Sequence, residues 1–296
     1  MPDARLLQRL RAMVDDEFDG KSPELVATLR HEFSNAFDSL ESLLAIGAVD
    51  TFADVMTLAK AKLHETQIQA RVRSRRLKIG LFPSTLNPIH WGHLLIGLQC
   101  VARLQLDMMV FLVHGEIKHK VFPKNSPPDW QRHQLAKEAL EHWNPLFRYS
   151  DVALSNSKKG EESLHDFRRL NASHELDLYC IWGAETKDRL RSIIEALVAH
   201  DSPSDIKDVP HRLILSVVTR DKSERDSDIP TALECRKIAM DKGLSWDMEI
   251  LELDTLPVSS TEYRDTGNPA LVPRSVHEFV TREGLYGLGP ARTISE

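Results

Sequence analysis

The chain has 296 residues, 42% of them hydrophobic, which is enough for one large or two moderate globular domains. With 38 basic and 44 acidic residues its net charge is -6, which argues against a general nucleic-acid binder. Its three cysteines show no zinc-binding spacing, and its apolar runs are too short to span a membrane. We therefore expect a cytoplasmic protein without a resident metal or a membrane contact. Its oligomeric state stays open, a homo-oligomer included.

The first 76 residues are predicted to be helical, because apolar residues recur at helical spacing from Leu25 to Leu44. Ser22 followed by Pro23 resembles a helix cap with proline at the first helical position. We predict helices over residues 3–14, 23–46 and 51–70. We place the boundary at residue 76, with a helical N-terminal extension over 1–76 and an α/β domain over 77–296.

From residue 77 onward, short apolar runs alternate with helical patterns. The runs that resemble strands are 77–82, 107–113, 147–154, 176–182, 212–218 and 248–253. Helical patterns lie near 92–105, 128–143, 162–172, 184–199 and 230–242. This alternation predicts a Rossmann-like, doubly wound and mostly parallel sheet, whose ligands bind beyond the carboxyl ends of its strands.

The stretch "LKIGLFPSTLNPIHWGHLL" (77–95) combines the first predicted strand, a loop and the start of a helix. It places His90 and His93 near the N-terminus of that helix, where free N–H groups and the helix dipole favour a polyphosphate. A metal site is a weaker interpretation, because the two histidines have no third ligand nearby. The histidine pair alone says little in a chain with 13 histidines.

Two motifs give this region a family resemblance. "STLNPIHWGHL" (84–94) and "LPVSSTEYRD" (256–265) resemble the signatures of the nicotinamide/nicotinate mononucleotide adenylyltransferases, in the HxGH nucleotidyltransferase superfamily. The stretch "LVPRSVHEFVTREGLYG" (271–287) resembles the closing helix of that family. Weaker similarities lie in "HKVFPKNSPPDWQRHQLAKEAL" (119–140), "YCIWGAE" (179–185) and "VVTRD" (217–221). The resemblance covers residues 77–287 in one order.

The resemblance implies transfer of AMP from ATP to a mononucleotide phosphate, with NAD or its deamido form and pyrophosphate as products. It implies ATP and a phosphate-bearing small molecule as ligands, and Mg²⁺ held mainly by ATP phosphates. His90, His93 and Arg264 would be catalytic. The residues expected to bind ATP are Leu81, Phe82, Thr85, Lys120, Gly183, Glu185, Ser259, Ser260 and Thr261.

The acceptor side departs from the family pattern. The usual Gly-Gly after the first strand is Pro83-Ser84, and the expected loop before the fourth strand is the acidic "GEES" (160–163), which favours the uncharged nicotinamide form. An acceptor such as phosphopantetheine or a sugar or polyol phosphate stays open, as does a non-catalytic nucleotide-binding module. The residues expected to bind the acceptor are Pro83, Ser84, Arg132, Glu162, Ser163 and Arg220.

Overall fold

A computed structural model describes residues 2–18, 23–45, 76–114, 125–152, 160–172, 175–183, 211–219, 230, 233–234, 236–237, 240–241 and 247–289. The helices predicted over 51–70 and 184–199 lie outside these residues. The parts of the predicted helix 230–242 that are described are helical.

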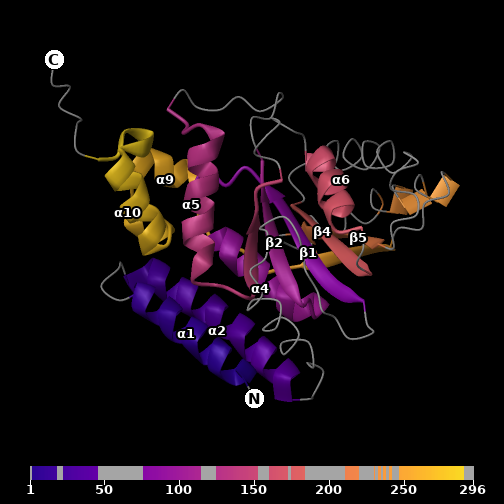
Figure 1. Cartoon of the computed structure of the whole chain (residues 1–296). Helices are drawn as coiled ribbons and strands as arrows, with labels where there is room; N and C mark the ends of the chain where they lie inside the picture. The colour runs from indigo at the N-terminus through magenta and orange to yellow at the C-terminus, as the bar shows by residue number, and fades with distance from the viewer. Residues whose placement is uncertain are drawn as a thin grey trace.

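The centre of the fold is a six-stranded parallel sheet (Figure 1). Its strands are β1 (Leu77–Ser84), β2 (Met108–Val113), β3 (Phe147–Ser150), β4 (Leu176–Gly183), β5 (His211–Thr219) and β6 (Asp247–Glu252). Their order is β3-β2-β1-β4-β5-β6, and every neighbouring pair is parallel. The predicted doubly wound, Rossmann-like fold is thus confirmed, and the sheet changes winding direction between β1 and β4.

Strand β1 runs two residues further than predicted and includes Pro83 and Ser84. Its pairing with β4 ends at Leu81, whereas its pairing with β2 continues through Pro83 to Ser84. Pro83 therefore lies where the strand has one neighbour, so its missing N–H interrupts no ladder with β4.

Three helices follow strands of the sheet: α4 (Trp91–Leu104), α5 (Asp129–Glu141) and α6 (Gly160–Leu170). Helix α4 contacts β1 and β2, and α5 contacts β2 and β3, while α6 lies on the other side of the strands from α5 (Figure 1). The "GEES" segment forms the first turn of α6, so the prediction of a loop there was wrong. Acidic residues suit a helix N-terminus, and the apolar face begins one turn later with the buried Leu164 and Phe167.

The C-terminal elements are short, and the two α-helices among them end in left-handed glycines. They are α9 (Ser260–Thr266), η1 (Pro269–Leu271), α10 (Arg274–Glu283) and η2 (Leu285–Gly287). Gly267 and Gly284 terminate α9 and α10 at φ values of 64° and 63°, a conformation that glycine adopts without steric cost. Helix α10 packs against α5 (Figure 1).

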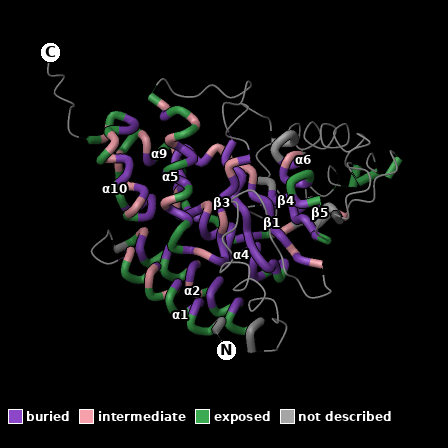
Figure 2. The backbone as a smooth tube through the Cα atoms, in the orientation of Figure 1, coloured by how far each residue is buried: buried purple, intermediate pink, exposed green. Residues whose placement is uncertain are grey.

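The N-terminal helices α1 (Pro2–Phe18) and α2 (Pro23–Ala45) pack on each other as a hairpin, and α2 packs on α4 (Figure 1). Helix α1 is longer than predicted because Val14 and Phe18 continue its buried face. Figure 2 shows the hairpin buried on the side toward α4 and exposed on the other. Its buried residues join those of α4 in one apolar cluster. The domain boundary at residue 76 stays a prediction.

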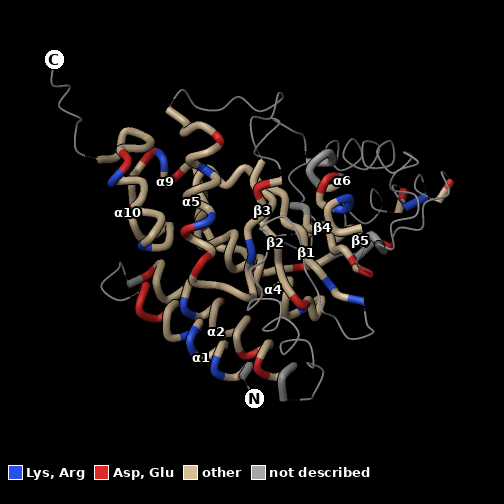
Figure 3. The backbone as a smooth tube through the Cα atoms, in the orientation of Figure 1, with Lys and Arg blue, Asp and Glu red and all other residues tan. Residues whose placement is uncertain are grey.

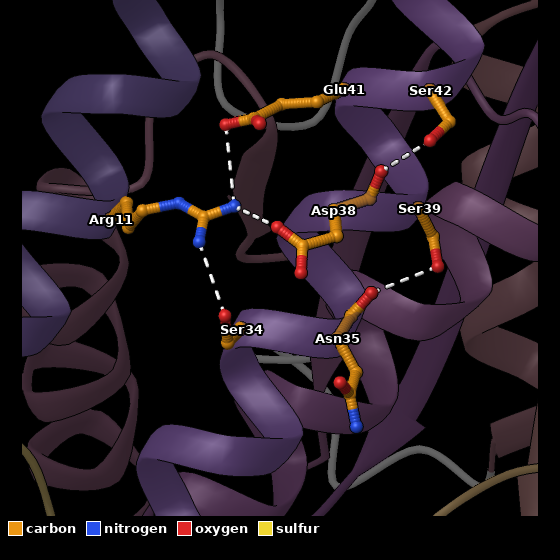
Figure 4. Close-up of polar contacts among 7 residues, drawn as sticks. All are labelled: Arg11, Ser34, Asn35, Asp38, Ser39, Glu41 and Ser42. Atoms are coloured by element: carbon orange, nitrogen blue, oxygen red, sulfur yellow. Dashed lines mark hydrogen bonds and ion pairs between the residues drawn. The ribbon is translucent and has the colours of Figure 1, made fainter.

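Both signs of charge alternate along the hairpin (Figure 3). Arg11 of α1 binds three residues of α2: Asp38 at 2.6 Å, Glu41 at 3.3 Å and Ser34 at 3.2 Å (Figure 4). These contacts join the polar sides of the two helices. No helix in the described part of the chain is long and apolar enough to cross a membrane.

Candidate active site at the start of helix α4

The candidate site lies at the carboxyl end of β1, beside the point where the sheet reverses its winding. The chain leaves β1 at Ser84, passes through residues 85–90 and enters α4 at Trp91. The first turn of α4 presents backbone N–H groups and the positive end of its dipole here. This is the place where doubly wound sheets bind ligands.

Both histidines cap the first turn of α4 with the same ring atom. His90 Nδ1 accepts the N–H of Gly92 at 3.1 Å, and His93 Nδ1 accepts the N–H of His90 at 3.2 Å. A neutral imidazole that accepts through Nδ1 carries its proton on Nε2. Burial lowers the pKa of His90 to about 3, so this ring is neutral at physiological pH. The cap thereby selects the tautomer that offers an Nε2–H donor.

The glycine between the histidines leaves room for the His90 ring in the cap. A Cβ on Gly92 would lie 3.0 Å from two ring atoms of His90 and 3.3 Å from Val258. The rings of His90 and His93 lie 3.8 Å apart between centroids, and the edge of Phe82 contacts His93. The geometry thus brings the predicted residues Phe82, His90 and His93 together.

Helix α9 brings Arg264 to the same loop. The Arg264 guanidinium donates to the carbonyl of Asn87 and, at 3.0 Å, to Thr261 Oγ1. Ser260 Oγ donates to the carbonyl of Pro88 at 2.8 Å, and Ser259 Oγ accepts the N–H of Glu262 at 3.1 Å. The two motifs therefore meet at the loop before α4, through contacts that span 172 and 177 residues of sequence.

Asn87 and Tyr286 hold this loop in place, although sequence reasoning did not count them among the site residues. The buried Asn87 side chain accepts from the Tyr286 hydroxyl at 2.7 Å and donates to Ser126 Oγ at 3.0 Å. Burial raises the pKa of Tyr286 against the opposing effect of the cations Arg132 and Arg264, so the phenol stays protonated and can donate. Their signals were the Asn-Pro pair and the Leu-Tyr pair that the motifs contain.

Arg132, predicted to bind the acceptor, lies beneath the loop. Its side chain is almost fully buried and donates to the carbonyls of Thr85 and His114, both at 2.8 Å. His114 in turn donates its N–H to the carbonyl of Ser84 at 2.9 Å. In this geometry Arg132 fixes the path of the chain between β1 and α4, and contact with an acceptor stays a prediction.

The remaining predicted site residues lie at the end of β1, at the end of β4, in α6 or outside the described part of the chain. Leu81 is buried inside the sheet, while Pro83, Ser84 and Thr85 are half-buried at the end of β1. Gly183 ends the neighbouring strand β4, at the same edge of the sheet. Glu162 and Ser163 lie in the first turn of α6. The remaining three, Lys120, Glu185 and Arg220, lie outside the described residues.

Comparison with known proteins identifies a family. The family model described as Cytidylyltransferase-like matches residues 81–266. A probable nicotinate-nucleotide adenylyltransferase of Clavibacter michiganensis subsp. michiganensis is 27% identical over 218 residues, which cover 71% of this chain and 94% of that protein. One from Clostridium tetani is 27% identical over 222 residues, covering 71% of this chain and 98% of that protein.

Among solved structures, the nicotinic acid mononucleotide adenylyltransferase of Plasmodium falciparum complexed with NaAD matches with a TM-score of 0.47 and 13% identity. The match covers 72% of this chain and 99% of that chain, and it is too distant to support a statement about function. The family match spans most of the sheet, both histidines and Arg264. The chain therefore belongs to the cytidylyltransferase-like family of nucleotidyltransferases.

Proposed function

We propose that this protein transfers the adenylyl group of ATP to the phosphate of a pyridine mononucleotide, nicotinate mononucleotide first, as a step of NAD biosynthesis. The observation that carries the proposal is the pair of imidazoles at the start of α4, whose backbone caps use Nδ1 and so set the Nε2–H tautomer at an anion-favouring helix terminus. Its match to relatives named as probable nicotinate-nucleotide adenylyltransferases supports the same reaction.

The reaction requires no nucleophile from the protein. A phosphate oxygen of the mononucleotide forms a bond to the α-phosphorus of ATP, the bond from that phosphorus to the α,β-bridging oxygen breaks, and pyrophosphate leaves. Negative charge grows on the transferring phosphoryl group and on the leaving group. The protein has to align two anions and stabilise that charge.

Each part of the site has a task in this reaction. His90 and His93 donate Nε2–H bonds to ATP phosphate oxygens, and the positive end of the α4 dipole adds to their effect. Arg264 brings positive charge to the same loop while its bonds to Asn87 and Thr261 fix its orientation. Neutral imidazoles are suited to this role because they donate without a proton transfer.

A Mg²⁺ ion would be held mainly by the phosphates of ATP. The described residues contain no group of three His, Cys, Asp or Glu side chains that could form a protein cage for a metal. Magnesium commonly binds through substrate phosphates and water, so a site whose side chains donate to the phosphates fits that arrangement. When bound, the ion would neutralise charge on the leaving pyrophosphate.

Nicotinate mononucleotide is proposed ahead of the nicotinamide form for two reasons. The named relatives act on nicotinate nucleotide by their descriptions. The argument for nicotinamide depended on "GEES" being a loop, whereas this segment is the first turn of α6.

The direct test is a matrix of donors and acceptors with the purified full-length protein and Mg²⁺. ATP and CTP are each combined with nicotinate mononucleotide, nicotinamide mononucleotide, phosphopantetheine and a sugar phosphate, and pyrophosphate release and the dinucleotide product are measured. We expect ATP with nicotinate mononucleotide to give the highest kcat/KM. Turnover only with a non-pyridine acceptor would reject the proposed acceptor, and ATP binding without any turnover would indicate a binding module.

A histidine substitution tests the role of the imidazoles. His93→Ala is expected to lower kcat by about 10²–10³-fold, the usual effect of removing one donor to transition-state charge. The matched control is His142→Ala at the far end of α5, about 15 Å along the helix from Arg132. Wild-type turnover in His93→Ala, or an equal loss in both variants, would remove His93 from the reaction.

A further inference from the structure

Trp91, the residue directly after His90, is held by the N-terminal hairpin. Its ring is buried and makes an edge contact with Phe18 of α1 at 4.9 Å between centroids, and another with Phe33 of α2 at 5.7 Å. Phe18 and Phe33 also contact each other, at 6.1 Å. Edge-to-face aromatic contacts are directional, so this cluster fixes the orientation of the indole as well as its burial.

The C-terminal end of α1 is also hydrogen-bonded to the start of α10. Glu17 accepts the backbone N–H of Arg274 at 2.8 Å, and the carbonyl of Asp16 accepts from the Arg274 guanidinium at 3.1 Å. Arg274 is the first residue of α10, whose own N-cap, Pro273, makes no side-chain cap bond. The Glu17 carboxylate of α1 therefore caps α10, and its negative charge is favourable at the positive N-terminal end of the helix dipole. The last turn of α1 is thus held between α4 and α10.

The hairpin lies outside the part of the chain that matches the family model. The family match begins at residue 81 and does not include α1 or α2. Trp91 lies inside the match, but both aromatic residues that orient it lie outside.

We infer that the hairpin aligns the catalytic helix, and that Trp91 is a positioning residue through which Phe18 and Phe33 set the angle of the first turn of α4. His90 and Trp91 are adjacent in the chain, and the N–H of His90 is bound by His93, so a rotation of the Trp91 backbone moves both imidazoles. The expected effect on kcat rests on the proposed function. The expected displacement of the imidazoles does not.

The test compares two cavities in one hairpin of the full-length protein. Phe18→Leu removes the aromatic contact with Trp91 and keeps an apolar side chain. Leu40→Ala, seven residues beyond Phe33 and so about 10 Å further along α2, makes a larger cavity in the same buried face. The melting temperature, kcat and KM are measured for both variants at a temperature where each is fully folded. The imidazole ¹⁵N and ¹³C resonances of His90 and His93 are recorded in parallel.

We expect Phe18→Leu to lower kcat about tenfold with a smaller change in KM, because a displacement of a catalytic group by a fraction of an ångström is costly. Its His90 and His93 resonances should shift. Leu40→Ala should lose more thermal stability yet keep wild-type kcat and histidine resonances. Equal kcat in the wild type and Phe18→Leu, or equal losses in both variants, would overturn the inference.

The histidine resonances distinguish a failure of the proposed function from a failure of the positioning inference. If the wild type makes no dinucleotide, the proposed function fails and the spectra still decide the inference. Shifted His90 and His93 signals in Phe18→Leu alone support the positioning role, and unchanged signals in that variant reject it.

Discussion

Two helices begin beside the same loop, and side chains of different chemistry cap their first turns. At α4, His90 and His93 accept backbone N–H groups through Nδ1 and keep a proton on Nε2. At α9, Ser259 accepts an N–H of the helix and Ser260 donates its hydroxyl hydrogen to the carbonyl of Pro88. The α4 cap uses only the Nδ1 atoms of its imidazoles, whereas at α9 the hydroxyl hydrogen of Ser260 is bound within the protein.

The difference follows from the number of functional atoms in each side chain. An imidazole has two nitrogens, so one can cap the helix while the other donates to a ligand. The Ser260 hydroxyl has one hydrogen, and once the carbonyl of Pro88 has accepted it no donor remains on that side chain. We therefore assign phosphate contacts chiefly to α4, and to α9 the task of holding Arg264 against the loop. Four substitutions test this division of labour.

The largest effect is expected from Gly92→Ala, which attacks the α4 cap directly. The added methyl group would lie 3.0 Å from the His90 ring, so the imidazole must shift by a few tenths of an ångström. We expect kcat to fall by about 10²-fold, as for other displacements of a catalytic group. The control is Gly97→Ala in the same helix, whose Cβ would be crowded by Phe147 and Phe111 in the core at 3.1 and 3.2 Å.

Gly97→Ala should lower the melting temperature and leave kcat near the wild-type value. If both alanine variants lose activity equally, crowding in α4 rather than the position of His90 would explain the loss, and the cap would have no special part in catalysis.

The second test measures how the stability that His90 contributes depends on pH. The pKa of His90 is about 3 in the folded state, and an unfolded histidine has a pKa of about 6.5. Between these values the unfolded state binds the proton more strongly, so stability is complete above pH 6.5 and falls as the pH is lowered toward 3. At pH 5 the loss from this residue is on the order of 2 kcal/mol.

His90→Asn keeps a side-chain oxygen at the N-cap but removes the titrating ring. Urea unfolding at pH 7 and pH 5 should therefore show a smaller stability loss in the variant than in the wild type. Burial also lowers the pKa of His133, to about 4, but His133 contributes equally to both proteins and cancels from the comparison. Identical losses would mean that His90 is not held neutral by the fold.

The sheet and the meeting of the motifs could be predicted from the sequence. Buried strands of a parallel sheet are short apolar runs, and all six predicted runs overlap the observed strands. The histidine motif lies at the junction of a strand and a helix, which is a local property of the sequence. The pattern of alternation also implied that distant strand ends share one edge, and Arg264 does reach that edge.

The tertiary contacts that hold the site residues in place could not be predicted from the sequence. Arg132 looks like a ligand-binding cation in sequence, but burial beneath two backbone carbonyls is decided by tertiary packing. The link between Asn87 and Tyr286 spans 199 residues, and the contact of Phe18 with Trp91 crosses the predicted boundary at residue 76. Such pairs cannot be predicted from residue spacing, because the spacing around each partner reports only the helix or strand in which that partner lies.

A more moderate effect is expected from Arg264→Lys, which tests the role assigned to α9. The guanidinium donates to Asn87 and Thr261 through two different nitrogens, and a lysine ammonium lacks this planar fork. We expect kcat/KM for ATP to fall about tenfold, although the charge is kept. The control is Arg282→Lys on the exposed face of α10, where we expect no change. Unchanged kcat/KM in Arg264→Lys would separate this residue from the phosphate site.

The smallest effect is expected from Ser259→Ala, which separates a helix cap from a ligand contact. Ser259 was predicted to bind ATP, whereas in the structure its hydroxyl oxygen accepts the N–H of Glu262 and its side chain is at the start of α9. Loss of a serine N-cap typically costs about 1 kcal/mol, which corresponds to a decrease in melting temperature of roughly 2–4 °C for a chain of this size. A capping role also predicts that KM for ATP changes by less than about twofold, because no bond to the ligand is lost. A hydroxyl that binds phosphate would give the reverse pattern, with KM raised several-fold and an unaltered melting temperature. That result would place donors from α9 as well as α4 on the substrate, and the contrast between an imidazole cap that serves the ligand and a serine cap that serves the fold would not hold.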